Sequence, residues 1–277
     1  MHRAKRDAPN VGALHACPFV DAELQKMPQW LWAGIWGLIA GSALLVGAAA
    51  GDLIALGRKV TAYVMAFGSG VLISALSFDL MGEAYRRGGF DSTSAGFLGG
   101  AVAYSVANWV LSRHGAKNRK RSGGQQPSEA ENPGSGLALA VGALLDGIPE
   151  SMVIGLSLIG GGAVSMVAVT AIFISNIPEG LSSSAGMKKA GRSRAWIFGL
   201  WSAITAISGA ASLIGYVAFR NASGEFIAAI TALAAGAILA MLADTMIPEA
   251  FDEARNWAGL ITVTGFLVAF ILTKLGG

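Results

Sequence analysis

Charged residues and cysteines are scarce in this sequence. Asp, Glu, Lys and Arg make up 13% of the 277 residues, whereas soluble domains carry about 25%. The single cysteine, Cys17, excludes a disulfide framework. The net charge is only +3, 53% of the residues are hydrophobic and the mean hydropathy is +0.56. This composition excludes a soluble globular enzyme, a disordered chain and a nucleic-acid-binding protein.

Long apolar stretches take the place of the missing charges. A helix crosses a bilayer with about 20 apolar residues, and no strand-like alternation of polar and apolar residues points to a transmembrane barrel. The sequence predicts an all-α membrane protein with eight transmembrane helices, the fourth and fifth joined by a turn at Gly160-Gly161-Gly162. The expected spans are 30–51, 60–78, 92–112, 137–160, 164–187, 195–219, 226–243 and 256–273.

Lys and Arg residues are concentrated in the loops that follow the first, third, fifth and seventh spans. The positive-inside rule places these loops in the cytoplasm, so both termini are expected outside. The chain then divides into an external tail at 1–29, spans 1–3 at 30–111, a cytoplasmic loop at 112–136 and spans 4–8 at 137–277. The tail has no apolar core of the kind that a secretory signal peptide carries.

The predicted cytoplasmic loop is rich in Gly, Gln, Pro and Ser and is expected to be a flexible linker. It contains the basic run Arg119-Lys120-Arg121. Two interpretations of this run remain open. It is an orientation signal on a solvated loop, or it contacts anionic lipid.

Seven carboxylates lie inside the predicted spans or at their ends. Placing one at the centre of a bilayer costs at least about 2.5–3.5 kcal/mol. No Lys or Arg lies in the middle of a span to neutralise them, so protons or bound cations are needed. The seven residues are Asp79, Glu83, Asp146, Glu150, Glu179, Asp244 and Glu249.

The spacing of these acids brings oxygen atoms onto single helix faces. Asp79 and Glu83 are four residues apart, as are Asp146 and Glu150, and Asn176 precedes Glu179 by three. Converging oxygens suit a hard or borderline cation. The predicted orientation arranges the acids in three levels. Asp79 and Glu83 lie at the outer mouth, Asp146, Glu150, Asn176 and Glu179 near the centre, and Asp244 and Glu249 at the inner mouth.

A Pro-Glu dipeptide preceded by isoleucine occurs three times, at Pro149-Glu150, Pro178-Glu179 and Pro248-Glu249. Proline within a helix removes one backbone hydrogen bond, and the freed carbonyl needs another partner in lipid. A bound cation is one such partner, and broken helices at mid-membrane are common in transporters. The sequence therefore predicts proline-broken fourth, fifth and seventh helices. The alternative is a simple kink that a neighbouring helix accommodates.

The segments Asp146–Ser151 and Ser175–Gly180 resemble the metal-site motifs of the ZIP family of divalent-metal transporters. In that family the fourth and fifth helices carry motifs similar to His-Asn-x-Pro-Glu-Gly and Gln-Asp-x-Pro-Glu-Gly. The resemblance implies eight transmembrane helices, external termini and a variable cytoplasmic loop between helices 3 and 4. Here Asp146 stands at the family's histidine, Asn176 at its aspartate and Ser175 at its glutamine, which leaves a site built from oxygen ligands.

The resemblance implies a transporter, not an enzyme, that moves a divalent cation into the cytoplasm between helices 4 and 5. Zinc follows from the family, while the oxygen ligands also suit Mn and Fe, and Cd is a further candidate. The metal is a substrate and no prosthetic group is expected. The candidate metal ligands are Asp146, Glu150, Asn176, Glu179, Ser175, Asp79, Glu83, Asp244 and Glu249.

The expected surroundings are membrane lipid, with no nucleic acid and with short loops that suggest a bacterial inner (plasma) membrane. The repeats Gly37-x-x-x-Gly41 and Gly47-x-x-x-Gly51 indicate either a homodimer interface or close packing of helix 1 within the bundle. Two other functions remain open. A ZIP-like sensor or structural protein without transport would explain the missing histidine, and an intramembrane metalloenzyme would use paired carboxylates, although no His-Glu-x-x-His motif is present.

Overall fold

The computed structural model describes residues 27–54, 57–159 and 164–275, and within these ranges the chain is helical with no strand. Most of the predicted tail at 1–29 and the predicted turn at 160–162 lie outside the described residues. The helices are α2 Gln29–Leu53, α3 Arg58–Ala75, η1 Leu76–Leu80, α4 Met81–Leu111, η2 Ser112–Ala116, α5 Ser135–Ser157, α6 Met166–Lys189, α7 Arg194–Phe219, α8 Gly224–Met241, η3 Leu242–Met246, α9 Ile247–Ala254, η4 Arg255–Trp257 and α10 Ala258–Leu275.

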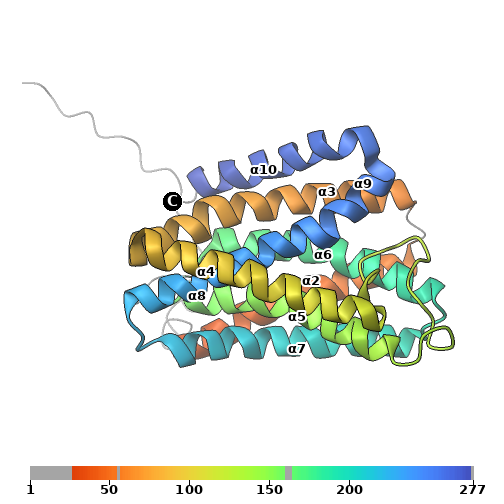
Figure 1. The fold of residues 1–277 in the computed structure, drawn as a ribbon, viewed down its shortest axis with the longest axis horizontal. Helices are drawn as coiled ribbons and strands as arrows, with labels where there is room; N and C mark the ends of the chain where they lie inside the picture. The colour runs from red at the N-terminus through yellow and green to blue at the C-terminus, as the bar shows by residue number, and fades with distance from the viewer. Residues whose placement is uncertain (1–26, 55–56, 160–163, 276–277) are drawn as a thin grey trace, which may run out of the picture.

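Six helical stretches of the described chain are long and apolar enough to cross a membrane. Four of them, α2, α5, α6 and α7, begin and end within a few residues of predicted spans. The other two are longer, with 59 residues at 58–116 and 51 residues at 224–274. The first contains positive φ values at Gly89 (69°) and, near its end, at Gly115 (102°), and the second contains one at Arg255 (43°). Figure 1 shows the ribbon turning back beside itself after α3 and after α9. The count of eight crossings stays a prediction.

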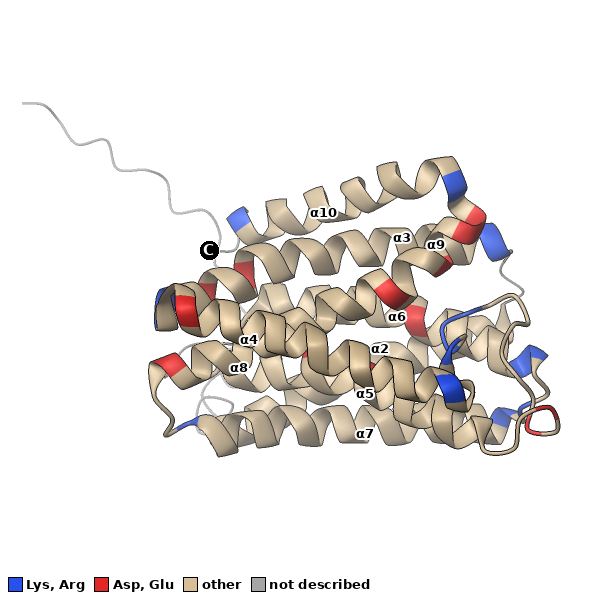
Figure 2. Cartoon of the chain, in the orientation of Figure 1, with Lys and Arg blue, Asp and Glu red and all other residues tan. Residues whose placement is uncertain are grey.

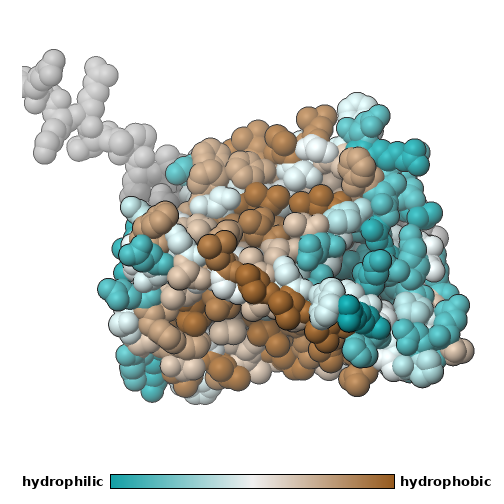
Figure 3. Space-filling view, viewed as in Figure 1, coloured by the Kyte–Doolittle hydropathy of each residue, from teal (hydrophilic) through white to brown (hydrophobic). Residues whose placement is uncertain are grey.

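The helices lie side by side along one direction (Figure 1). The most extensive packing is between α4 and α8, followed by α2 with α6 and α7, and by α3 with α10. Charged residues gather at the two ends of the bundle, and most of the blue Lys and Arg residues lie at the end that holds residues 117–134 (Figure 2). A broad hydrophobic surface separates the two polar ends (Figure 3). This distribution is typical of an integral membrane protein.

The predicted proline breaks are not confirmed. Pro149 lies within α5 and Pro178 within α6, and both helices are assigned without interruption. Proline fixes φ near a helical value, so a helix can continue through it with one hydrogen bond lost. Pro248 lies in the first turn of α9, directly after the π-helical turn η3. A second π-helical turn, η1, precedes α4. Such turns are frequent at functional sites, and η1 and η3 carry Asp79 and Asp244. A third π-helical turn, η2, carries no acid.

Glycines bring α2 into backbone contact with two other helices. A Cβ on Gly47 would lie 2.1 Å from the carbonyl oxygen of Ile177 in α6, and one on Gly37 would lie 2.8 Å from that of Ser208 in α7. Gly41 and Gly51 also face these helices. The repeats therefore serve packing within the bundle, and the homodimer stays a prediction. The contact at Gly47 fixes the part of α6 that carries Glu179.

Replacing Gly47 by alanine is expected to destabilise the protein by about 1–3 kcal/mol, because the new methyl group has no room against the α6 backbone. The melting temperature of the detergent-purified protein measures this. Gly199→Ala is the matched control, since a Cβ at this α7 position meets nothing within 4 Å. An equal melting temperature for both variants would contradict the close α2–α6 contact.

Candidate functional site

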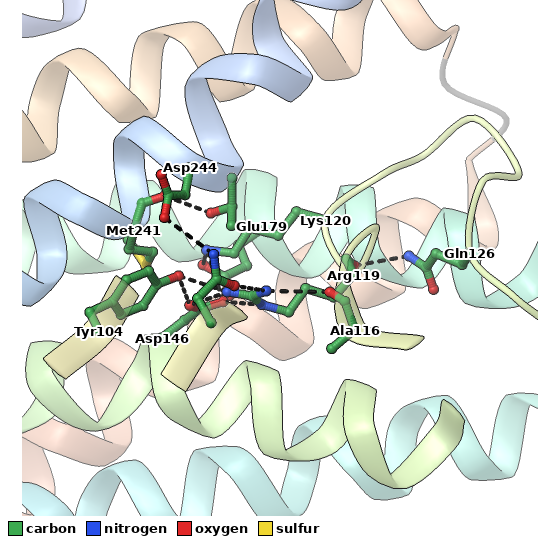
Figure 4. Close-up of polar contacts among 11 residues, drawn as sticks. Tyr104, Ala116, Arg119, Lys120, Gln126, Asp146, Glu179, Met241 and Asp244 are labelled. Carbon is green, nitrogen blue, oxygen red and sulfur yellow. Dashed lines mark hydrogen bonds and ion pairs between the residues drawn. The ribbon is translucent and has the colours of Figure 1, made fainter. Parts of the chain in front are cut away.

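A buried network of acids and bases lies between α4, α5, α6 and the segment that follows η2 (Figure 4). Its centre is Asp146 of α5, which is 2% exposed. The Tyr104 hydroxyl donates to Asp146 Oδ1 over 2.7 Å. Arg119 Nε donates to Oδ2 and Arg119 Nη2 to Oδ1, each over 2.8 Å. Both oxygens of the carboxylate are therefore held by one guanidinium, the strongest hydrogen-bonded pairing that a carboxylate makes in proteins.

Glu179 of α6 joins the same network through Lys120. Lys120 Nζ lies 2.7 Å from Glu179 Oε2 and 3.3 Å from Asp146 Oδ2. Lys120 and Glu179 are 3% and 4% exposed. A single ammonium group thus bridges the carboxylates of two helices. The sequence pattern places Asp146 and Glu179 near one another, and the ammonium bridge agrees with that placement.

Glu150, one turn after Asp146, has no such partner. It is 2% exposed, and its Oε1 atom is buried without a hydrogen bond. It lies within electrostatic reach of Glu179, Lys120 and Asp146. A buried carboxylate oxygen without a donor is costly. The three central acids Asp146, Glu150 and Glu179 therefore outnumber the two buried cations Arg119 and Lys120 by one.

The interpretation of Arg119 and Lys120 as solvated or lipid-facing residues of a loop is wrong. Both side chains are buried among the acids of α5 and α6. The expectation that no Lys or Arg neutralises the central acids is wrong for the same reason. Burial of an unpaired charge costs several kcal/mol. Pairing between the acids of the spans and the basic residues that follow η2 lowers this cost for both groups.

The remaining predicted central residues are turned toward helix backbones. Asn176 Nδ2 donates to the carbonyl oxygen of Ala40 in α2 over 3.0 Å. The Ser175 hydroxyl donates to Ile172 O within α6 over 2.9 Å. Both residues are buried beside Glu179, but their donors are used by backbone carbonyls. Asn176 therefore links α6 to α2 in this structure.

The two predicted outer acids line one small pocket at the other end of the bundle. Its volume is about 190 Å³, and its walls include Asp79, Glu83, Ser157 and Ser165. The Ser165 hydroxyl donates to Asp79 Oδ2 over 2.6 Å. Glu83 forms ion pairs with Arg86 and Arg87. The structure thus brings Asp79 and Glu83 to one cavity, with cations already beside Glu83.

The two predicted inner acids are separated from each other. Asp244 is exposed and accepts a hydrogen bond of 3.2 Å from Asn108 Nδ2. Glu249 is 6% exposed and accepts hydrogen bonds from the backbone N–H and the hydroxyl of Ser122, over 2.9 and 2.8 Å. Glu249 therefore contacts the segment after η2, whereas Asp244 contacts α4.

No three His, Cys, Asp or Glu side chains within the described ranges are grouped closely enough to hold a metal ion. The contacts explain this at the centre, because the Lys120 ammonium stands between Asp146 and Glu179. The central acids are paired with the side-chain cations of Arg119 and Lys120.

Sequence reasoning missed Tyr104 and the site roles of Arg119 and Lys120. Tyr104 was detectable as a polar tip within an otherwise apolar span, since a buried tyrosine hydroxyl usually finds a partner. Its hydroxyl also accepts a 2.7 Å hydrogen bond from Arg119 Nη2. For the basic run, the signal was the surplus of acids in α5 and α6, which needs positive charge from elsewhere in the chain.

The sequence is similar to that of a curated plant protein. The chain is 29% identical over 191 residues to the Arabidopsis thaliana protein named "Putative zinc transporter At3g08650". The matched region covers 67% of this chain and 29% of the relative, so the chain spans less than a third of the length of that protein. No family model matches the chain.

Proposed function

We propose that this chain is a divalent-metal transporter of the ZIP kind, whose ion passes between α5 and α6. One observation carries the proposal: Asp146, Glu150 and Glu179 are buried together, and Glu150 Oε1 has no hydrogen-bond donor. Acids of this kind within a membrane are expensive and mark ion pathways. The similarity to a plant protein named as a zinc transporter supports the same role.

In the proposed topology the chain crosses the membrane eight times, with both termini outside and residues 112–136 in the cytoplasm. The positive φ values at Gly89 and Arg255 support two reversals inside the two longest helical stretches. The concentration of Lys and Arg at the end with residues 117–134 (Figure 2) supports that end as the cytoplasmic one. The metal would enter at the pocket of Asp79 and Glu83 and leave past Glu249. A bacterial inner membrane remains part of the proposal.

Zinc is the first candidate for the transported ion, with Mn, Fe and Cd next. Zinc accepts carboxylate oxygens, while a site without imidazole or thiolate ligands is open to harder ions. The proposed ligands are Asp146, Glu150 and Glu179, with the Asn176 and Ser175 oxygens at their sides. For a dication, an inside-negative potential contributes about 4.6 kcal/mol per 100 mV to entry.

An uptake panel with the purified protein in liposomes tests the proposal. Zn, Mn, Fe, Cd, Co, Mg and Ca are offered outside, under an inside-negative potential. Saturable uptake of zinc or another transition metal is expected above the leak into protein-free liposomes. If none of the seven ions enters faster than into protein-free liposomes, the chain is not a transporter of these ions.

A ZIP-like metal sensor or structural protein without transport is the second candidate. The observation that favours it is the filling of the acid site by Arg119 and Lys120. Thermal stabilisation by zinc without any flux in the same liposomes would support it. Flux of zinc would exclude it.

A further inference from the structure

The segment at 117–126 enters the acid site from one end of the bundle. Arg119 and Lys120 project from it toward Asp146 and Glu179 (Figure 4). The two basic side chains are each 3% exposed, although they lie in a segment that connects two spans. Long cationic side chains normally extend toward water. Their burial here means that the segment is directed inward.

Backbone contacts hold the segment in this position. Gln126 Nε2 donates to Arg119 O over 2.9 Å, and also to Arg121 O and Ser183 O over 3.1 Å. The Ser182 hydroxyl donates to Lys120 O. These bonds tie residues on both sides of Lys120 to the cytoplasmic half of α6.

The side that faces α9 is held as well. Ser122 donates twice to Glu249, and Lys189 Nζ donates to Ser122 O over 2.7 Å. Arg121 forms ion pairs with Glu249 and Asp252. Glu249, predicted as a metal ligand at the inner mouth, is therefore engaged by the segment. The segment thus contacts the central acid Glu179 through Lys120 and the α9 acid Glu249 through Arg121 and Ser122.

The Lys120 ammonium occupies the place that a bound dication would need. It lies 2.7 Å from Glu179 and 3.3 Å from Asp146, between carboxylates of two helices. The Arg119 guanidinium uses both oxygens of Asp146. A metal ion bound by Asp146 and Glu179 would meet two positive charges at these distances. Metal binding and docking of the segment therefore exclude each other.

We propose that residues 117–126 form an intramolecular plug, in which Lys120 and Arg119 are tethered cations that compete with the metal for Asp146 and Glu179. The proposal rests on the function proposed above and adds its regulation. Metal binds only to the fraction of molecules whose plug is withdrawn, so its apparent affinity is reduced by that fraction. Charge removal from the plug raises this fraction and with it the apparent affinity.

Calorimetric binding of Zn²⁺ and Cd²⁺ to the full-length protein in nanodiscs tests the plug. Lys120→Gln is expected to lower the dissociation constant at least tenfold. Lys117→Gln is the matched control, because Lys117 belongs to the same segment, carries the same charge and is exposed. This variant should bind as the unaltered protein does. The comparison separates removal of the plug from a general change of charge.

A second measurement uses the unaltered protein. Trypsin cleavage after Lys120 and Arg121 should be slow without metal and accelerate when Zn²⁺ is added, because metal displaces the plug. Equal affinities for Lys120→Gln and the unaltered protein, or metal-independent cleavage, would overturn the plug and leave transport standing. Absence of metal binding to all three proteins would overturn the proposed function, and the plug as a competitor with it.

Discussion

Metal uptake by the Glu150→Gln protein is expected to fall at least about 100-fold in liposomes. Glu150 is buried and its Oε1 atom has no hydrogen bond, so the carboxylate is available for a cation. Glutamine has nearly the same size but no negative charge. Changes to groups that only support a metal ligand already cost about 10–100-fold, and loss of a ligand in a desolvated site should cost more.

Because Glu150 Oε1 accepts no hydrogen bond, Glu150→Gln should change the charge without disturbing the fold. No hydrogen bond of Oε1 is lost, so the melting temperature should be unchanged. Glu225→Gln is the matched control, because Glu225 in the first turn of α8 is exposed. Uptake at the unaltered rate by Glu150→Gln would remove Glu150 from the ion path.

The pair of Arg119 and Asp146 is expected to show the largest effect on stability. Asp146→Asn leaves the guanidinium without its anion, and Arg119→Gln leaves the carboxylate with Lys120 and Tyr104 alone. Breaking one partner of a buried ion pair costs about 3–5 kcal/mol. For a protein of this size we expect each single variant to melt roughly 10 °C lower.

The double variant Arg119→Gln/Asp146→Asn distinguishes a pair from two independent residues. Since neither charge is left without its partner, it should be more stable than the sum of the single effects, by about 2 kcal/mol or more. Arg220→Gln and Asp91→Asn, both at exposed positions, are the matched controls. Strict additivity in the double variant would mean that the pair is not coupled in solution.

Several features of the fold follow from local sequence. The apolar stretches at 30–51, 137–160, 164–187 and 195–219 reappear as α2, α5, α6 and α7, because the thickness of a bilayer sets the length of a spanning helix. The spacing of Asp146 and Glu150 places both on one face of α5, where both are buried. These properties depend on residues within one or two helical turns.

The geometry of η1 and η3 did not follow from the sequence. These two π-helical turns each carry a candidate acid, whereas the π-helical turn η2 carries none. Pro248 removes a backbone donor just after η3, which makes a disturbed turn there understandable, but no such residue accompanies η1. At Pro149 and Pro178 the same residue type leaves the helix assignment uninterrupted. Packing around each proline, and not the proline alone, therefore decides between a break and a continuous helix.

The sequence by itself determined that acids would be buried in helices and would need positive charge. Only the tertiary structure decided where that charge comes from. Arg119 reaches Asp146 across 27 residues, and Lys120 reaches Glu179 across 59. The physical reason is that helix length and helix face are set by neighbours in sequence, whereas the partner of a buried charge is set by which distant segment folds back within about 3 Å of it.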